Sequence, residues 1–437
     1  MVTVADAAAS PCSILLLGGP VGPFFANLAR VLVRRGFVVE RCLFNPGDGL
    51  FGLGDALALS PEDVGRQLEA PPWQAAVVFG VDRSRHKVLF DALRARNVPV
   101  LCLEEGYIRP GFVACEWNGS HHHSPLRLRP DAQKRDCRDR SDVTEPDEGR
   151  CHGLRQSLFA IAQVVWLLAL IPILGGTWHR ERRLAGEALY WPLGWMRRAL
   201  HKCSDARILK ELVEAGMPYR VVALQVHDDA NLVANGQGWH VKTMIKELLE
   251  AFSHYAPPEE HLLFKIHPLD AGHLDHRAIV AEAIGGRVIA KRVHVVCDVP
   301  LGVAVKASCG LITVNSTSGL SGLHHGVQTD VLGLAFYEGN GLARHCSDLG
   351  MIWTTPHSPD PRTVATLKMR IYAHAVIPGS FYGAGAIERL AWRVANRLVT
   401  GMPQPSIIDT KTSNPDCIHY CSEIAFHSDI SESSSSI

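Results

Sequence analysis

The sequence has no excess of charge of either sign, no paired cysteine motif and no recognisable secretory leader. Its 44 basic and 44 acidic residues cancel, so overall charge gives no support for a nucleic-acid partner, and none is expected. The 12 cysteines are scattered, without a C-x-x-C pair or a metal-like quartet, which favours free thiols in a reducing cytosol. Residues 1–11 lack a basic segment followed by an apolar core, so no signal peptide is expected.

What is present is a repeated alternation of short apolar runs with stretches of helical periodicity. With 437 residues the chain is long enough for two or three domains. Such β-α-β alternation predicts parallel, doubly wound sheets. We therefore expect an α/β fold in which two Rossmann-like domains face a cleft, as in glycosyltransferases of the B type. The strands of the second domain are expected near 220–225, 261–266, 287–289 and 310–314.

The expected domain boundaries follow the changes in composition. One Rossmann-like domain would span 1–150 and the other 216–380, with an apolar and basic helical linker over 151–215. A helix over 381–401 would close the fold. The Ser-rich end, 402–437, is typical of a disordered tail.

Three apolar runs in the second half end abruptly in polar residues. They lead into Gln225 with Asp228 and Asp229, into Lys265-Ile266-His267-Pro268, and into Asn315-Ser316-Thr317-Ser318-Gly319. In an open parallel sheet, ligands bind just beyond the carboxyl ends of the strands. An acid, a Lys/His pair and a hydroxyl-rich loop would then surround one crevice. This arrangement suits a phosphate-bearing sugar donor.

Two pairs of adjacent acids also follow apolar runs. Glu104 and Glu105 would be costly to bury unless they face water or a ligand. Adjacent carboxylates can raise one another's pKa, which suits a general acid, although a solvated turn is the alternative. In the other pair, Asp228 or Asp229 could be a nucleophile while its neighbour orients it or forms a salt bridge. If strand geometry continued, the two would point to opposite faces.

One segment, 158–175, is almost wholly apolar. It is near the lower length limit for a membrane span, and Gln163 and Pro172 interrupt it. Basic residues flank it, at Arg155 before it and between Arg180 and Arg198 after it. We expect a helix that lies on a membrane surface or in the core rather than a span.

Two further patterns carry less information. The glycine cluster 18–23 departs from G-x-G-x-x-G because of its prolines, so a tight turn and a ligand loop are equally compatible. The run His121-His122-His123 lacks acidic or cysteine partners at metal spacing. No metal site is expected there or elsewhere.

Taken together, the motifs resemble those of the KpsS/LipB capsule polysaccharide proteins, which are Kdo transferases of Gram-negative bacteria. The resemblance runs from about residue 13 to 400, and the segments that carry it are LLLGGPVGPFFANLARVL, NPGDGLF, EEGYIRPGF, LQVHDD, KIHP and VNSTSGLSGLHHG. The chain departs from the family at Gly18, where a Gln is usual, and at 326–329, where Gly-Lys-Pro-Val is usual.

The resemblance implies transfer of Kdo from CMP-Kdo, with retained configuration and no cofactor, onto a lysophosphatidylglycerol-type lipid. This step would start the linker of a capsular polysaccharide. It implies a cytoplasmic protein, peripheral to the inner membrane. The implied partners are CMP-Kdo, a phospholipid acceptor, the inner-membrane surface and other capsule assembly or export proteins.

The resemblance also implies roles for individual residues. Asp229 would be the nucleophile, and Glu104 or Glu105 the acid/base. The first domain would supply the acceptor side and the second would bind the CMP-sugar. The donor-binding residues would be Gln225, Lys265, His267, Asn315, Ser316, Thr317, Ser318 and Gly319. The acceptor-side residues would be Gly19, Pro20, Asn45, Asp48 and Arg109.

Two other functions fit the same residues. One is a non-catalytic capsule export or assembly factor that uses the fold only for binding; heat stabilisation by CMP without turnover would favour it. The other is a nucleotide-sugar epimerase, which would act on the free donor without a lipid.

Overall fold

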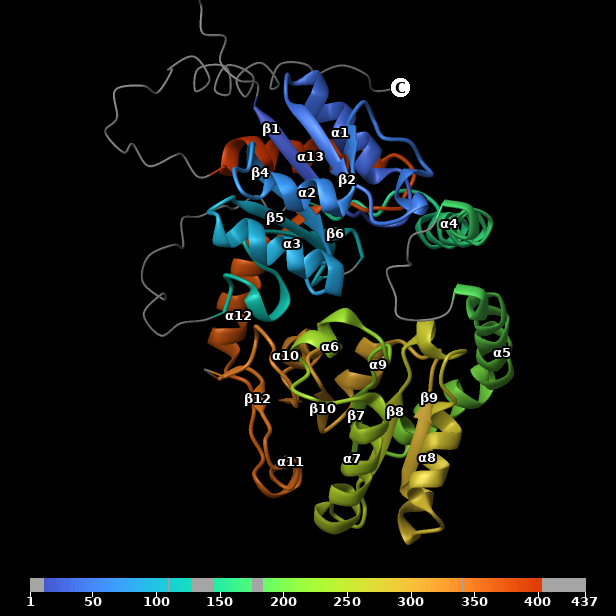
Figure 1. Ribbon diagram of the computed structural model, residues 1–437. Helices are drawn as coiled ribbons and strands as arrows, with labels where there is room; N and C mark the ends of the chain where they lie inside the picture. Colours follow the sequence, from blue (N-terminus) through green and yellow to red (C-terminus); the bar gives the residue numbers. More distant parts are fainter. Residues whose placement is uncertain (1–11, 109, 128–144, 175–183, 340, 403–437) are drawn as a thin grey trace, which may run out of the picture.

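The computed structural model describes residues 12–108, 110–127, 145–174, 184–339 and 341–402. Within them the chain forms two separate sheets, one in each half, with helices packed around each (Figure 1). The expected α/β fold with two Rossmann-like halves is confirmed.

The first sheet has seven strands in the order β13-β6-β5-β4-β1-β2-β3. Strands β1 to β5 are parallel to one another, whereas β6 pairs antiparallel with β5 and β13 pairs antiparallel with β6. The strands are β1 (Ser13–Leu17), β2 (Val38–Cys42), β3 (Leu57–Leu59), β4 (Trp73–Phe79), β5 (Val100–Glu105), β6 (Phe112–Trp117) and β13 (Val376–Pro378).

Both faces of this sheet are buried, because successive side chains of a strand point to opposite sides. Ile14 and Leu16 face helices α1 (Phe24–Arg34) and α13 (Ala386–Gly401). Leu15 and Leu17 face the other layer, made by α2 (Pro61–Gln67) and α3 (Ser84–Ala95). The continuous apolar run of β1 is therefore that of a central strand.

The second sheet has six parallel strands in the order β12-β11-β10-β7-β8-β9. They are β7 (Tyr219–Ala223), β8 (His261–Lys265), β9 (Val293–Val296), β10 (Gly310–Thr313), β11 (Gln328–Val331) and β12 (Arg344–His345). Its helices are α6 (Ala230–Asn235), α7 (Val241–Tyr255), α8 (His276–Ile284), α9 (Leu301–Lys306), α10 (Gly319–His325), α11 (Met351–Thr354) and α12 (Pro361–Arg370).

The two halves share an apolar cluster and polar contacts. The cluster joins Tyr107 and Phe112 of the first half to Phe336 and Ile371 of the second. The Asn235 side-chain amide donates to a carboxylate oxygen of Asp82 at 3.2 Å. Arg127 pairs with Glu338 at 2.6 Å. The halves are thus in direct contact beside the cavity described below.

Two long helices follow the first half. Helix α4 (His152–Leu174) lies against that half through Phe159, whose ring packs edge-on to Phe51 at 5.2 Å, and through buried Gln163. Its other side is open, with Leu154, Leu158 and Val165 each more than half exposed. Among the described residues, the stretch His152–Leu170 is long and apolar enough to cross a membrane, by length and composition only. Helix α5 (Leu184–Glu214) then leads to the second half.

Two expectations need correction. The chain returns to the first sheet at β13, which pairs with β6, so the boundary expected at residue 380 lies before Val376. The strand expected at 287–289 is a short 3₁₀ helix, η5 (Val288–Arg292), followed by the actual strand β9. Val288 is almost fully exposed, which a strand of the buried sheet would not allow. The expected tail, 402–437, lies outside the described residues apart from Met402.

Candidate functional site

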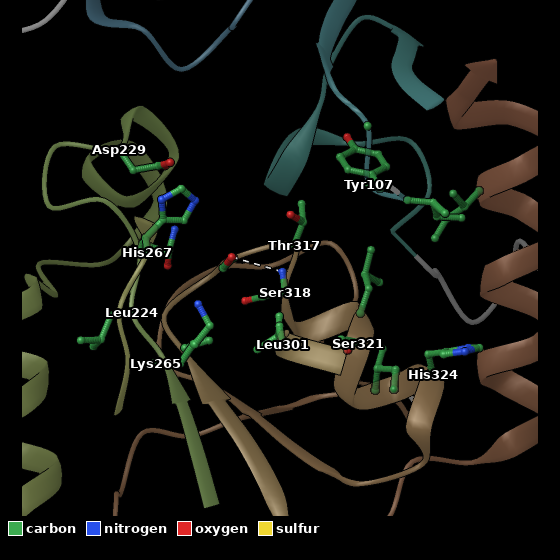
Figure 2. A pocket seen from close by; sticks show the side chains of 18 of the residues that line it. Tyr107, Leu224, Asp229, Lys265, His267, Leu301, Thr317, Ser318, Ser321 and His324 are labelled. Atoms are coloured by element: carbon green, nitrogen blue, oxygen red, sulfur yellow. Dashed lines mark hydrogen bonds between the residues drawn. The ribbon is translucent and has the colours of Figure 1, made fainter. Parts of the chain in front are cut away.

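A cavity of about 750 Å³ lies between the two halves. Its walls come from the residues that follow β7, β8 and β10, from Gly106–Ile108 after β5, and from α10 and α12. Strand order reverses between β10 and β7, which is the place where open α/β sheets bind ligands. The volume is within the usual range for small-molecule sites. Figure 2 shows Asp229 and His267 on one side of this cavity and Tyr107 on the other.

Lys265 and His267 stand at the carboxyl end of β8, as expected, and both line the cavity. Burial lowers the pKa of Lys265, whose ammonium group donates to the Ile266 carbonyl oxygen at 3.1 Å. The His267 Nδ1 atom accepts the Leu269 backbone N–H at 3.2 Å. A neutral ring that accepts at Nδ1 carries its proton on Nε2. His267 can therefore act as a donor through Nε2 while Nδ1 holds its turn.

Asp229 also lines the cavity, and it caps helix α6. One carboxylate oxygen accepts the backbone N–H groups of Asn231 at 2.9 Å and Leu232 at 3.1 Å. Burial raises the pKa of Asp229, and these N–H groups oppose that rise because they stabilise the charged form. Strand β7 ends at Ala223, so the alternation that would place Asp228 on the opposite face does not extend this far. Asp228 is not part of the cavity lining.

The hydroxyl-rich loop after β10 contributes Ser316, Thr317 and Ser318 to the cavity. The Ser316 hydroxyl accepts the backbone N–H of Ser318 at 3.2 Å, and the Tyr337 hydroxyl donates to the Ser316 carbonyl oxygen. The last residue of the motif, Gly319, does not line the cavity. A Cβ atom there would stand 2.3 Å from the Tyr337 hydroxyl, so glycine is required for packing.

Gln225 lines the cavity and is hydrogen-bonded to Asn315, which does not. The Gln225 amide donates to the Asn315 side-chain oxygen at 2.9 Å, and the Asn315 backbone N–H donates to the Gln225 side chain at 3.2 Å. The Asn315 amide also donates to the Asn231 carbonyl oxygen at 2.9 Å. Asn315 is buried behind the cavity wall, so the structure gives it a supporting place and not the expected donor-contacting one.

Glu104 and Glu105 end strand β5 on the first-half side. Glu104 lies 3.7 Å from the Nε2 atom of His121. Glu105 accepts from the Gln156 amide of α4 and from the Tyr382 hydroxyl, each at 3.4 Å. The negative charge of Glu104 contributes to the raised pKa of Asp229. Neither Glu104 nor Glu105 lines the cavity, whereas Gly106, which follows them, does.

The expected acceptor-side residues are used mainly to build turns. Asn45 accepts the Gly47 N–H at 2.8 Å, and Asp48 accepts the Phe44 N–H at 2.8 Å and the Asn45 N–H at 3.2 Å. Neither these two residues nor Gly19 and Pro20 line the cavity. Arg109 lies outside the described residues.

Gly18, one of the departures from the family motif, also has a structural explanation. Its φ is +64°, in the left-handed region that favours glycine. A Cβ atom there would lie 2.4 Å from the His86 imidazole. A glutamine at this position would therefore require His86 to move.

Sequence reasoning missed Asp82 and gave His121 no role beyond metal binding. Asp82 follows β4, beside β1, where the order of the first sheet reverses; a strand-end acid at that point was a usable signal. The partner of His121 is Glu104, which is distant in sequence and comes near only through the β5–β6 pairing. No group of three or more His, Cys, Asp or Glu residues in the described ranges is arranged to hold a metal ion.

Comparison with known proteins gives a consistent set of relatives. The family model described as "Capsule polysaccharide biosynthesis protein" matches residues 74–382. The capsule polysaccharide modification protein LipB of Neisseria meningitidis serogroup A is 30% identical over 385 residues, covering 85% of this chain and 91% of LipB. The capsule polysaccharide export protein KpsS of Escherichia coli is 28% identical over 369 residues, covering 79% and 90%.

A solved structure is also similar in outline. The β-Kdo 2,7 transferase of Thermosulfurimonas dismutans KpsC aligns over 88% of this chain and 99% of its own, with 13% identity and a TM-score of 0.40.

Proposed function

The chain belongs to the capsule polysaccharide biosynthesis protein family, and from this premise we propose that it is a retaining glycosyltransferase. The proposed donor is CMP-Kdo, and the proposed acceptor is a lysophosphatidylglycerol-type lipid. The product would be the first part of the linker that anchors a capsular polysaccharide. No cofactor or metal is invoked.

One observation supports this proposal: groups suited to binding and attacking the donor line one cavity, and two candidate acid/base residues end the strand that leads into its opposing wall. Asp229 lines the cavity from the second half, and Lys265 and His267 stand beside it. Glu104 and Glu105 end β5 directly before Gly106–Ile108 of the opposing wall, and neither glutamate lines the cavity itself. The chemistry of transfer with retention needs a nucleophile on one side and an acid/base on the other.

The negative groups of the proposed sugar donor are complementary to the hydrogen-bond donors that line the second-half side of the cavity. CMP-Kdo carries a phosphodiester and a sugar carboxylate. The Lys265 ammonium group and the Nε2–H of His267 would donate to these anionic oxygens. The hydroxyls of Ser316, Thr317 and Ser318 would add neutral donors.

Two displacements would then give retention of configuration. The Asp229 carboxylate attacks the anomeric carbon of Kdo, a carbon–oxygen bond forms, and the bond to the phosphate breaks as CMP leaves with its electron pair. An acceptor hydroxyl next attacks the same carbon, Glu104 or Glu105 takes the hydroxyl proton, and the Asp229 carboxylate is released. Two inversions at one carbon restore the original configuration.

A mass-spectrometric transfer assay tests the proposal. Purified protein is incubated with CMP-Kdo and lysophosphatidylglycerol, and the lipid is expected to gain the mass of Kdo while CMP appears in equal amount. Hydrolysis or isomerisation of CMP-Kdo without lipid would instead indicate an epimerase-like activity. Stabilisation by CMP with no product under any lipid condition would identify a non-catalytic export or assembly factor.

We further propose that the protein works in the cytoplasm on the inner-membrane surface, docked through α4. The inward side of α4 is held to the first half, since Arg155 donates to the Tyr382 carbonyl oxygen at 2.8 Å and Phe159 packs on Phe51. The outward side presents Leu154, Leu158 and Val165. A helix held along one side fits a position in the membrane plane better than a span.

Vesicle binding tests this placement. Co-sedimentation with anionic vesicles is expected, and a Leu158→Asp/Val165→Asp double variant should lose most of it. Exposed Val88 on α3, changed to Asp, serves as a control away from α4. Carbonate washing should release the wild-type protein from membranes; release only by detergent would contradict peripheral docking.

A further inference from the structure

We propose that Asp270 is a positioning residue: its buried carboxylate ties the loop that carries Asp229 to the turn that carries His267, and so places the nucleophile against the bound donor. This inference rests on the proposed function, in which Asp229 attacks the sugar and His267 binds the donor. Asp270 itself does not line the cavity. It follows β8, at the end of the short 3₁₀ helix η4 (Pro268–Asp270). Figure 2 shows Asp229 and His267 on the same side of the cavity.

The first support is the contact between the Asp270 carboxylate and His227. The Oδ1 atom lies 2.6 Å from His227 Nδ1, and the Oδ2 atom accepts the backbone N–H of His227 at 3.2 Å. A carboxylate only accepts, so Nδ1 carries the proton. His227 stands two positions before Asp229, whose own N–H donates to the Val226 carbonyl oxygen at 2.9 Å. A shift of His227 would therefore move Asp229 as well.

The backbone of Asp270 holds the other loop. Its N–H donates to the His267 carbonyl oxygen at 2.9 Å, and the Leu269 N–H donates to the His267 ring at 3.2 Å. One residue is thus hydrogen-bonded to the donor turn through its backbone and to the nucleophile loop through its side chain. A substitution of the side chain removes the second contact and leaves the first, so the two can be separated by experiment.

The Asp270 side chain is fully buried, so its charge needs compensation. The Nε2 atom of His276, which is also buried, lies 3.1 Å from Oδ2. Burial alone would raise the pKa of Asp270, but the interactions with His227 and His276 outweigh this effect and hold the pKa well below its usual range. Asp270 is therefore a carboxylate at neutral pH, and both of its oxygens can accept.

The chain that follows Asp270 is fixed to α5. Arg197 donates to the Ala271 carbonyl oxygen at 3.1 Å and pairs with Asp275 at 2.8 Å. A Cβ atom at Gly272 would stand 1.9 Å from the Tyr190 carbonyl oxygen, so the turn packs directly on the helix backbone. A side chain can set the position of a neighbouring loop only if its own backbone is held, and these contacts hold it.

Asp270→Leu keeps the branched shape of the side chain and removes both acceptor oxygens. The loop that carries Asp229 then loses its two contacts, whereas the donor turn keeps its backbone hydrogen bonds. We expect the transfer rate at saturating substrates to fall roughly 10- to 100-fold, the size of loss that a misplacement of about 1 Å can produce. CMP affinity should stay near that of wild type. Asp270→Asn, which keeps one acceptor oxygen, should lie between.

Asp330 of β11 provides a matched control for stability. Its side chain is equally buried, and it accepts from Arg344 at 2.7 Å and from the Gln328 amide at 2.8 Å. It does not line the cavity. Asp330→Leu should therefore lower the urea concentration at which the protein unfolds, as Asp270→Leu should, but leave the transfer rate of the folded protein unchanged.

His227→Ala tests the same contact from its other side. The His227 side chain is 29% exposed, so this variant should fold even if Asp270→Leu does not. It removes the ring contact and should lower the transfer rate without loss of CMP affinity. Because both changes break one contact, the double variant His227→Ala/Asp270→Asn should be little slower than the slower of the two single variants.

Hydrogen exchange gives a measurement that does not depend on activity. The backbone N–H groups of His227 and Asp229 are both hydrogen-bonded in the loop. In Asp270→Leu the peptide that contains them should take up deuterium faster than in wild type, as measured by mass spectrometry. In Asp330→Leu its uptake should match that of wild type.

Three results would overturn the inference: an unchanged transfer rate in folded Asp270→Leu and His227→Ala, an equal loss of rate in Asp330→Leu, or unchanged deuterium uptake by the loop in Asp270→Leu. Failure of the proposed function is distinguishable from these. Wild-type protein would then form no product, while deuterium uptake would still show whether Asp270 holds the Asp229 loop.

Discussion

The strands of both halves end in polar residues of similar kinds, but the two halves use them differently. After β2, Asn45 and Asp48 accept backbone N–H groups of their own turn. At the end of β8, by contrast, the side chains of Lys265 and His267 both line the cavity. The carboxyl end of a strand thus predicts where a side chain lies, but local hydrogen bonds decide what it can still bind.

Sheet order explains part of this difference. Strands β7, β8 and β10 are neighbours at the centre of the second sheet, so their ends converge where the order reverses. Strand β2 lies next to the edge of the first sheet, away from that sheet's reversal between β1 and β4. A polar residue after β2 is therefore placed to cap a turn.

The largest effect should come from the second half. Asp229→Ala is expected to lower the transfer rate by roughly 10⁴-fold or more, because Asp229 is the only carboxylate among the described residues that line the cavity. CMP affinity should remain, as measured by calorimetry. Asp228→Ala, which alters an acid outside the cavity lining, should retain much of the activity. The opposite order of effects would contradict the assignment of Asp229.

A smaller loss is expected at His267. Removal of a donor to a charged group costs about 1.5–3 kcal/mol, so His267→Ala should bind CMP about 10- to 100-fold more weakly. His267→Asn separates two explanations, because asparagine can still accept the Leu269 N–H but lacks the Nε2 donor. If asparagine restores CMP affinity, then His267 contributes to binding by holding the turn through the Leu269 N–H and not by donating from Nε2.

Asn315 should affect stability rather than binding. Asn315→Ala leaves the Gln225 amide without its partner, which should lower the free energy of unfolding by about 1–3 kcal/mol. Thr317→Ala, in the same loop but on the cavity wall, should weaken CMP binding with little change in stability. Urea unfolding and CMP titration of both variants check this; a large affinity loss in folded Asn315→Ala would argue for direct donor contact.

The smallest effect is expected in the first half, at Asp48. Loss of a capping carboxylate costs about 1 kcal/mol, so Asp48→Ala should unfold at lower urea concentration with unchanged CMP affinity. Asp48→Asn should lie between, because its amide oxygen can still accept both N–H groups but carries no negative charge. A fall in transfer rate without loss of stability would instead restore Asp48 to the acceptor site.

The sequence predicted the features that depend on residues close together in the chain. Apolar runs ending in polar residues located β7, β8 and β10, and with them Asp229, Lys265 and His267. It gave no indication that the Asn315 side chain faces Gln225, because that contact joins two strands distant in the sequence. A strand-end motif thus identified the site but not the internal hydrogen bonds.

Non-local pairing explains the missed strands. Strand β6 contains Glu116, an acid in the middle of an apolar run, and its burial is compensated by Tyr107 and Ser124. Strand β13 has only three residues, which is too few for a periodic pattern. It forms because its backbone pairs with the otherwise unpaired edge of β6. Similarly, the partnership of His121 with Glu104 depends on the β5–β6 hairpin.

The return of the chain to its first sheet has a consequence for biosynthesis. After Trp117, residues 118–375 must be made before β13 can add the last strand and α13 can cover α1. At roughly 5–20 residues per second, the ribosome needs about ten seconds to a minute for that stretch. During this time the apolar face formed by Ile14, Leu16 and Leu28 lacks its cover, so the nascent first half is a candidate client for chaperones until β13 and α13 have been made.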